Sequence, residues 1–259
     1  KVTDTFDLFP SSNFIFSVTE NSNMRFSYSK TTARPSFKEA SIAQIFDPLS
    51  NITYIGNIDL KPTYIDNLDL RFENFGENNQ MFAVSAFYKN FKDPIELSYF
   101  ESARENFQPR NLGNATVYGV EIEARKNISE YFSINVNASI IESKQKYGEA
   151  ENTLRTLGLR TGETLNGSRE LQGQSPYLIN ASIDYKDDTT RAGLYFNMQG
   201  KTLEIVGNGI SPDIYTHPYE SLNFTFSKSF GKESKKSINI KAENLLNSKK
   251  ESYAESYNA

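Results

Sequence analysis

The stretch 114–143 constrains the fold more than any other part of the chain. Apolar side chains alternate with charged or amide side chains along both of its halves, 120–125 and 132–140. This period of two, on either side of a polar turn at 129–130, predicts an antiparallel hairpin with one apolar face. Its arms of about ten residues exceed the usual strand of about five or six, and they match the length of a β-strand that crosses a bilayer.

The same alternation recurs along the rest of the chain. It predicts strands at 13–18, 24–31, 64–75, 81–91, 177–185, 191–201, 222–230 and 237–245, and it allows strand extensions at 95–100 and 104–111. Short polar turns join the strands of each pair, at 20–23, 76–79, 187–189 and 231–234. Long connections separate the pairs, at 32–63, 92–113, 144–175 and 202–218. Transmembrane barrels have this order, with short periplasmic turns and long extracellular loops, so we expect a membrane barrel. A water-soluble sheet protein stays the alternative.

The two faces of these strands have different surroundings in a sandwich and in a membrane barrel. In a sandwich the apolar face forms the core, whereas in a membrane barrel it contacts lipid and the polar face lines the lumen. The lumen would then hold charged side chains from alternate strand positions: Asp69, Arg71, Glu121, Glu123, Arg125, Lys241 and Glu243. Aromatic side chains near the short turns would form an interfacial girdle: Phe75, Phe82, Tyr131, Phe132, Tyr185 and Phe230.

Composition excludes several classes of function. The chain has 28 basic and 32 acidic residues and a formal net charge of −4, whereas nucleic-acid binding requires a basic field. It has no cysteine and a single histidine, His217, which excludes thiolate metal sites and most histidine chemistry. Glu121 and Glu123 lie two residues apart on one strand face, where they line a wet lumen more simply than they form a catalytic pair. We predict no enzyme, no cofactor and no metal site.

Several motifs resemble the barrel of TonB-dependent outer-membrane receptors, in particular those of Bacteroidota. The motifs occur in the family's order and cover nearly the whole chain: SKTTARPSF at 29–37, GNIDLKP at 56–62, SAFYK at 85–89, DPIE at 93–96, YGVE at 118–121, RELQGQSPYLIN at 169–180 and AENLLN at 242–247. One departure is Ile58, where the family usually has proline. Each motif alone is weak, but their joint order is specific.

The resemblance implies a parent barrel of about 22 strands with an N-terminal plug domain and a TonB box. The chain has no signal peptide at its start and stops soon after a strand, so we interpret it as an internal fragment. Residues 1–259 would be one domain, a meander of about ten antiparallel strands from the C-terminal part of the barrel, without the plug and the closing strand. Because such a piece cannot close, we expect a curved open sheet with two unpaired edges.

The resemblance also implies a function. The whole protein would bind a scarce extracellular ligand, such as a siderophore or an oligosaccharide, and import it across the outer membrane of a Gram-negative bacterium. Its partners would be the lipid bilayer, its own plug domain, the TonB complex and a surface lipoprotein. Arg155, Arg160 and Arg169 in the loop 144–175 are candidate contacts for an anionic ligand, the alternative being a solvated basic loop. The rival functions are a non-transporting barrel or adhesin and a water-soluble carbohydrate-binding sheet.

Overall fold

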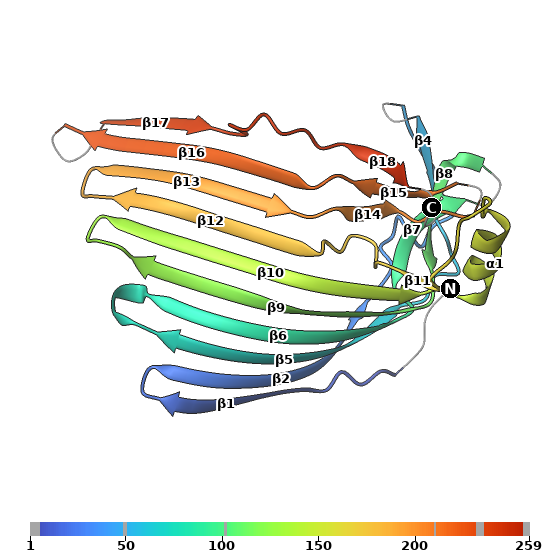
Figure 1. Ribbon diagram of the computed structural model, residues 1–259, viewed down its shortest axis with the longest axis horizontal. Helices are drawn as coiled ribbons and strands as arrows, with labels where there is room; N and C mark the ends of the chain where they lie inside the picture. Colours follow the sequence, from blue (N-terminus) through green and yellow to red (C-terminus); the bar gives the residue numbers. More distant parts are fainter. Residues whose placement is uncertain (1–5, 49–50, 101–102, 210, 232–235, 256–259) are drawn as a thin grey trace.

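The computed structural model describes residues 6–48, 51–100, 103–209, 211–231 and 236–255. Its main feature is one large antiparallel sheet whose strands lie side by side in sequence order (Figure 1). From edge to edge these strands are β1 (Ser11–Thr19), β2 (Ser22–Ala33), β5 (Thr63–Phe75), β6 (Met81–Lys92), β9 (Asn114–Asn127), β10 (Phe132–Lys146), β12 (Tyr177–Lys186), β13 (Thr190–Gln199), β16 (Tyr219–Phe230) and β17 (Lys236–Ala242). The predicted meander is confirmed. Among the described residues, β1 and β17 each pair on one side only, so the sheet is open with two edges, as expected.

The hairpin of β9 and β10 shows how the sequence sets the pairing of strands. Val136 lies opposite Ala124, and Asn137 lies opposite Glu123. Apolar side chains therefore face apolar partners on one side of the sheet, and polar side chains face polar partners on the other. Because a slip of one residue would exchange the two faces of a strand, the alternation fixes the register of the whole meander.

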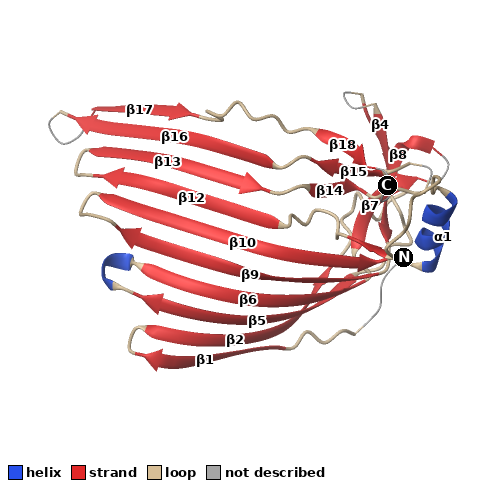
Figure 2. Cartoon of the chain, in the orientation of Figure 1, coloured by secondary structure: helices blue, strands red, loops and turns tan. Residues whose placement is uncertain are grey.

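The two ends of the large sheet differ. The hairpins β1–β2, β5–β6, β9–β10 and β12–β13 all turn at the same end, which is at the left in Figure 2. The turn between β5 and β6 holds a short 3-10 helix, η1 (Glu77–Asn79). Most of the predicted turn at 231–234 lies outside the described residues. The four long connections all lie at the opposite end, so the predicted alternation of short turns and long connections is confirmed.

The long connections contain secondary structure, although we expected loops there apart from the strand extensions allowed at 95–100 and 104–111. A sheet in the order β3-β4-β8-β7 contains β3 (Gln44–Asp47), β4 (Ile52–Ile55), β7 (Ile95–Phe100) and β8 (Ala103–Asn111). A second small sheet contains β14 (Thr202–Ile205), β15 (Asp213–Thr216) and β18 (Ser252–Glu255), while β11 (Ser168–Arg169) pairs with β10. The helix α1 (Glu149–Leu157) lies beside them. The segments allowed as strand extensions form β7 and β8, but in a separate sheet. Among the described residues, no helix is both long and apolar enough to cross a bilayer.

The apolar face of the large sheet is not covered by a second layer within the described part of the chain. Large apolar side chains along it stay between 44% and 61% exposed: Phe16, Leu70, Ile122, Ile183 and Ile240. A two-layer sandwich would bury these side chains. The described residues therefore do not form the sandwich that was the alternative fold.

The opposite face carries ion pairs within and between strands. Arg71 on β5 donates to Glu73 (3.1 Å), to Glu123 on β9 (3.0 Å) and to the hydroxyl of Ser85 on β6 (3.1 Å). Arg25 on β2 donates to the other carboxylate oxygen of Glu73 (2.9 Å). Arg71 and Glu123, two of the charged residues that we predicted for the polar face, thus cross-link strands there, as charges beside a wet space do.

Candidate functional site

Buried charged side chains gather at the loop end of the sheet, the end where the long connections lie, because these connections fold over one another there. The chain leaves β6 through Asp93 (φ +54°) and enters β9 through Gly113 (φ +102°). Between these two bends the β7–β8 hairpin turns away from the large sheet (Figure 1). This hairpin reaches the end of β14. There the backbone N–H of Val206 donates to the carbonyl oxygen of Leu97 (3.0 Å), and the backbone N–H of Tyr99 donates to the carbonyl oxygen of Val206 (3.2 Å).

Buried ion pairs join the connection 144–175 to the connection 202–218. Arg155 on α1 is 0% exposed, and its guanidinium donates to both carboxylate oxygens of Asp213 at the start of β15 (2.9 Å each). It also donates to Glu151 one helical turn earlier (2.9 Å). Asp213 accepts a further hydrogen bond from the backbone N–H of Gly207 (2.6 Å). A planar fork between arginine and a carboxylate is strong and directional, so it fixes α1 against β15.

A second arginine extends these pairs to the connection 92–113. Arg169 in β11 donates to both carboxylate oxygens of Glu96 in β7 (2.8 and 2.7 Å) and to Glu151 (3.0 Å). The same Glu151 oxygen therefore accepts hydrogen bonds from both arginines. Three long connections share one buried network, which we call the cross-loop cluster: Glu96, Glu151, Arg155, Arg169 and Asp213.

Both arginines of the cluster stay cationic despite their burial. Burial by itself would lower the pKa of Arg155, but the hydrogen bonds and charge of Asp213 outweigh it and raise the pKa above its ordinary value. The pKa of Arg169 is raised in the same way, because Glu96 offsets the effect of burial. The cluster is therefore held by full charges on its basic members.

The structure separates the three arginines that the sequence singled out as ligand contacts. Arg155 and Arg169 are 0% and 7% exposed and form forks with carboxylates of this same chain. Arg160 lies after α1 and is exposed. Ligand binding by any of the three stays a prediction, and the geometry of Arg155 and Arg169 is that of residues that hold loops together.

Sequence reasoning missed the carboxylates of the cross-loop cluster. Glu96 lies 73 residues from Arg169, and Asp213 lies 58 residues from Arg155. Glu96 and Arg169 both stand in motifs that resemble the family, DPIE and RELQGQSPYLIN. Those motifs were the only signal, and they do not show that the two residues pair.

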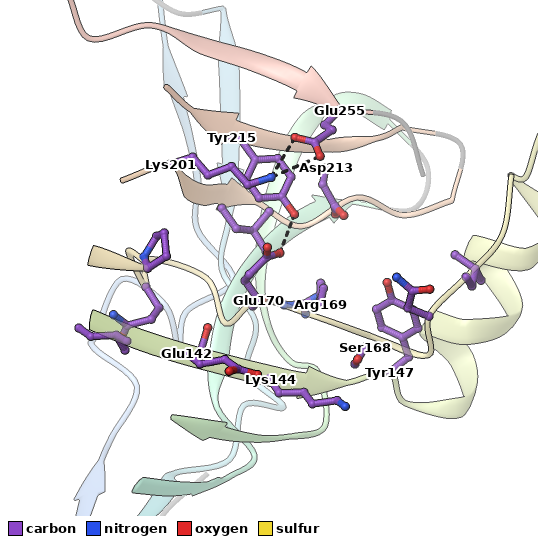
Figure 3. Close-up of a pocket in the computed structure, with 17 residues that line it drawn as sticks. Glu142, Lys144, Tyr147, Ser168, Arg169, Glu170, Lys201, Asp213, Tyr215 and Glu255 are labelled. Atoms are coloured by element: carbon purple, nitrogen blue, oxygen red, sulfur yellow. Dashed lines mark hydrogen bonds and ion pairs between the residues drawn. The ribbon is translucent and has the colours of Figure 1, made fainter. Parts of the chain in front are cut away.

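A cavity of about 540 Å³ lies beside the cross-loop cluster, between β10 and the small β14–β15–β18 sheet. Figure 3 shows charged and aromatic side chains on its opposite sides, with Glu170 between them: Lys201, Tyr215 and Glu255 on one side, and Glu142 and Lys144 on the other. Arg169 and Asp213 of the cross-loop cluster also line the cavity. Its volume is within the range of about 300–1,000 Å³ that is common for small-molecule sites.

Hydrogen bonds and an ion pair hold together the side of the cavity that carries Lys201, Tyr215 and Glu255 (Figure 3). The hydroxyl of Tyr215 donates to Glu170 (3.0 Å), and the ammonium group of Lys201 lies 4.4 Å from the centre of the Tyr215 ring. Lys201 also donates to Glu255 (3.3 Å). Burial, followed by the charges of Glu170 and Asp213, raises the pKa of Tyr215 above its ordinary value. Its hydroxyl therefore stays protonated and acts as a donor.

Two glycines allow the end of α1 to approach the turn before β15. A Cβ atom on Gly158 would lie 1.7 Å from the carbonyl oxygen of Gly209. Gly209 itself has φ +87°, where a side chain is strained, and its own Cβ would lie 2.0 Å from the carbonyl oxygen of Leu154. The close approach that brings Arg155 to Asp213 thus requires glycine at positions 158 and 209, because any Cβ atom there would overlap the facing backbone.

Fold and loop arrangement together define the class of protein as the wall and loops of a membrane β-barrel. A family model described as "TonB dependent receptor-like, beta-barrel" matches residues 2–245. The chain belongs to this family of TonB-dependent receptors.

Solved structures of receptors and transporters share the fold. Similar structures include the ferric enterobactin receptor (PfeA) of Pseudomonas aeruginosa, with a TM-score of 0.60 and 15% identity over 92% of this chain. They also include the siderophore receptor PirA of the same organism, with a TM-score of 0.58 and 14% identity over 92% of the chain. The copper transporter OprC has a TM-score of 0.62 and 12% identity over 91% of the chain.

The alignments cover 34%, 36% and 33% of those three chains, so this chain spans about a third of their length. At these identities the likeness shows the fold alone. No curated protein matches the chain. The predicted fold class is confirmed: the open antiparallel sheet is part of a TonB-dependent β-barrel, a fold of receptors and transporters in the outer membrane rather than of enzymes.

Proposed function

We propose that this chain is the C-terminal part of the barrel of a receptor in a Gram-negative outer membrane, of the type that resembles Bacteroidota proteins. The whole receptor binds a scarce extracellular ligand and imports it by TonB-dependent active transport. Residues 1–259 form one domain of it and contribute barrel wall and extracellular loops. A plug domain, the TonB complex and a surface lipoprotein are its proposed partners.

One observation carries this proposal. The sheet has short turns at one end and structured connections at the other, and its apolar face stays open between them. A barrel wall needs an apolar outer face to contact acyl chains, and a receptor needs a shaped loop end to hold its ligand. The cross-loop cluster supplies that shape, because it fixes three long connections against one another before any ligand binds.

The test is uptake by the full-length receptor that contains this chain. We would express it in a Gram-negative host that lacks its own receptors, with and without functional TonB. The substrates would be radiolabelled ferric enterobactin, copper and a set of neutral oligosaccharides. The proposal predicts uptake of at least one of them with TonB and loss of that uptake without TonB.

The rival functions give different results in the same strains. A non-transporting barrel or adhesin would fractionate with the outer membrane, but uptake would be the same with and without TonB. A water-soluble carbohydrate-binding sheet would leave the membrane fraction on washing without detergent. Either result would overturn the transport proposal.

A further inference from the structure

We infer that the apolar face of β6, β9 and β10 ends, at the loop end, in a site for the phosphate groups of a membrane lipid. The site consists of three exposed lysines, which we call the lysine patch: Lys92, Lys144 and Lys146. This inference goes beyond transport, because the patch would hold the barrel wall to the surrounding lipid rather than bind the imported ligand. Register, height in the membrane and charge each support it.

The register of the three strands brings these lysines together. Outward positions on β6, β9 and β10 form rows, which are, from the apolar face to the loop end: Ala86, Val120 and Ile140; then Tyr88, Tyr118 and Glu142; then Asn90, Thr116 and Lys144; then Lys92 and Asn114, with Lys146 two residues after Lys144. With strands about 4.8 Å apart and about 6.8 Å between every second residue, the three lysine Cα atoms lie within about 12 Å. Beyond Ile140, β10 no longer pairs with β12, so Lys144 also borders the cavity there.

The height of the lysine patch matches the headgroup layer of a bilayer. On β10 the outward apolar side chains run from Phe132 to Ile140, about 27 Å along the strand. A strand tilt of about 40° reduces this length to about 21 Å across the membrane, close to the apolar band of about 25 Å in outer-membrane barrels. The next row carries Tyr118, and tyrosine is enriched at membrane interfaces. Lys144 and Lys146 lie about 5 and 10 Å beyond that row, and lysine side chains bend toward the headgroups, a layer of about 5–8 Å.

Charge complementarity selects an anionic headgroup. Within the described part of the chain, none of the three ammonium groups is held in an ion pair or a hydrogen bond. Two carboxylates occupy neighbouring outward positions. Glu142 lies one row nearer the membrane, and Asp66, opposite Asn90, accepts a hydrogen bond from the hydroxyl of Tyr28 (2.9 Å). Lys30 lies on the other side of Asp66, so positive charge exceeds negative charge along this edge of the face.

A phosphate group fits three clustered ammonium groups better than a neutral headgroup does. Its several acceptor oxygens can each take a hydrogen bond from an ammonium group, which only donates. Lysine is a flexible point charge, so three lysines can converge on one or two phosphates without a fixed geometry. Each lysine near an anionic lipid strengthens binding by about a factor of five.

Outward lysines at the turn end provide a matched control. Lys126 on β9, Lys228 on β16 and Lys236 on β17 are exposed and continue the same face beyond its apolar residues. They do not form a comparable patch, because β10, β12 and β13 separate the first from the other two. Their replacement removes the same number of charges from the same face.

Native mass spectrometry of the full-length receptor in detergent tests the inference. The receptor would be titrated with diphosphorylated lipid A and with the same lipid after removal of its phosphate groups, and inorganic phosphate would be added as a competitor. We expect the phosphorylated lipid to bind, and we expect the triple variant Lys92→Gln, Lys144→Gln and Lys146→Gln to weaken its binding by about a hundredfold, since three factors of about five multiply to about that value. The control variant Lys126→Gln, Lys228→Gln and Lys236→Gln should leave the dissociation constant unchanged.

Three results would overturn the inference: the lipid binds equally well without its phosphate groups, the two triple variants weaken binding equally, or inorganic phosphate at the lipid's own concentration displaces the lipid. The last result would mean that the lysines bind soluble phosphate. These failures differ from failure of the proposed function. TonB-dependent uptake without phosphate-dependent lipid binding would leave the transport proposal standing and remove the lipid site. Lipid binding that the lysine-patch variant loses, without TonB-dependent uptake of any substrate, would do the reverse.

Discussion

Replacement of Arg155 by methionine tests whether the cross-loop cluster holds the loop end together. Methionine keeps an unbranched side chain of similar reach but removes the guanidinium. The change deletes both hydrogen bonds from Arg155 to Asp213 and the one to Glu151. Asp213 is 5% exposed and keeps the backbone N–H of Gly207 among its donors, while Glu151 keeps Arg169.

The free energy lost in Arg155→Met follows from the burial of the Arg155–Asp213 ion pair. Removing one partner of a buried ion pair costs about 3–5 kcal/mol, because the other charge stays buried without compensation. An exposed pair is worth only about 0–1 kcal/mol. Since Arg155 is 0% exposed, the larger cost applies to the local opening of α1 and of residues 207–209 and 211–213. At about 1.4 kcal/mol per factor of ten, their amides should exchange roughly a hundred- to several-thousand-fold faster.

Hydrogen exchange measured on the full-length receptor by mass spectrometry checks this prediction. Arg160→Met is the matched control, because Arg160 lies in the same connection and is exposed. It should change exchange in these peptides by less than about threefold, as expected for a surface substitution worth about 0.5 kcal/mol. If Arg155→Met and Arg160→Met had equal effects, the buried fork would not stabilise the loop end and the reasoning would be refuted.

Three further predictions follow from the geometry. Gly158→Ala should lower the free energy for local opening of α1 and of residues 207–209 and 211–213 by about 1–3 kcal/mol, because its methyl group would overlap the carbonyl oxygen of Gly209. Hydrogen exchange in the same peptides measures this change. The pKa of Tyr215 is raised in the folded loops, so the protonated hydroxyl stabilises them fully below the ordinary tyrosine pKa of about 10, and this stabilisation is lost as pH rises above that value. Proteolytic nicking of the loops should therefore accelerate above about pH 10. The acceleration should be smaller in Tyr215→Phe. Ile122→Arg should destabilise the barrel in lipid by about 2–4 kcal/mol in urea unfolding, and Glu121→Arg on the opposite face should cost less; equal costs would contradict the assignment of the faces.

The sequence was sufficient to predict the large sheet because every strand repeats one local rule. Along 120–125 of β9 and 132–140 of β10 each side chain is apolar or polar according to the face on which it lies, and the register follows from that alternation. The turns follow from short polar stretches at regular intervals. No long-range information is needed to place neighbours in a meander, since each strand pairs with the next.

The loop end could not be predicted in the same way, because its structure depends on contacts that are far apart in sequence. Arg155 and Arg160 look alike in a basic loop, and only the distant Asp213 makes one of them a buried structural group. The strands β14 and β15 are four residues each, too short for a clear alternation. The helix α1 has no side-chain cap at its start, and a glycine at each end, Gly148 and Gly158, gives the signature of a loop.

Cysteine scanning of β9 in the full-length receptor tests the central claim most directly. The claim is that the apolar face of the sheet contacts acyl chains and the polar face contacts water. This chain contains no cysteine, and any cysteine elsewhere in the receptor would be replaced, so single cysteines at positions 120–124 can each carry a spin label. In bilayers, labels at Val120 and Ile122 should collide with oxygen dissolved in lipid, and labels at Glu121 and Glu123 should collide with a water-soluble nickel complex. Accessibility that fails to alternate with a period of two, or that alternates with the faces reversed, would contradict the account.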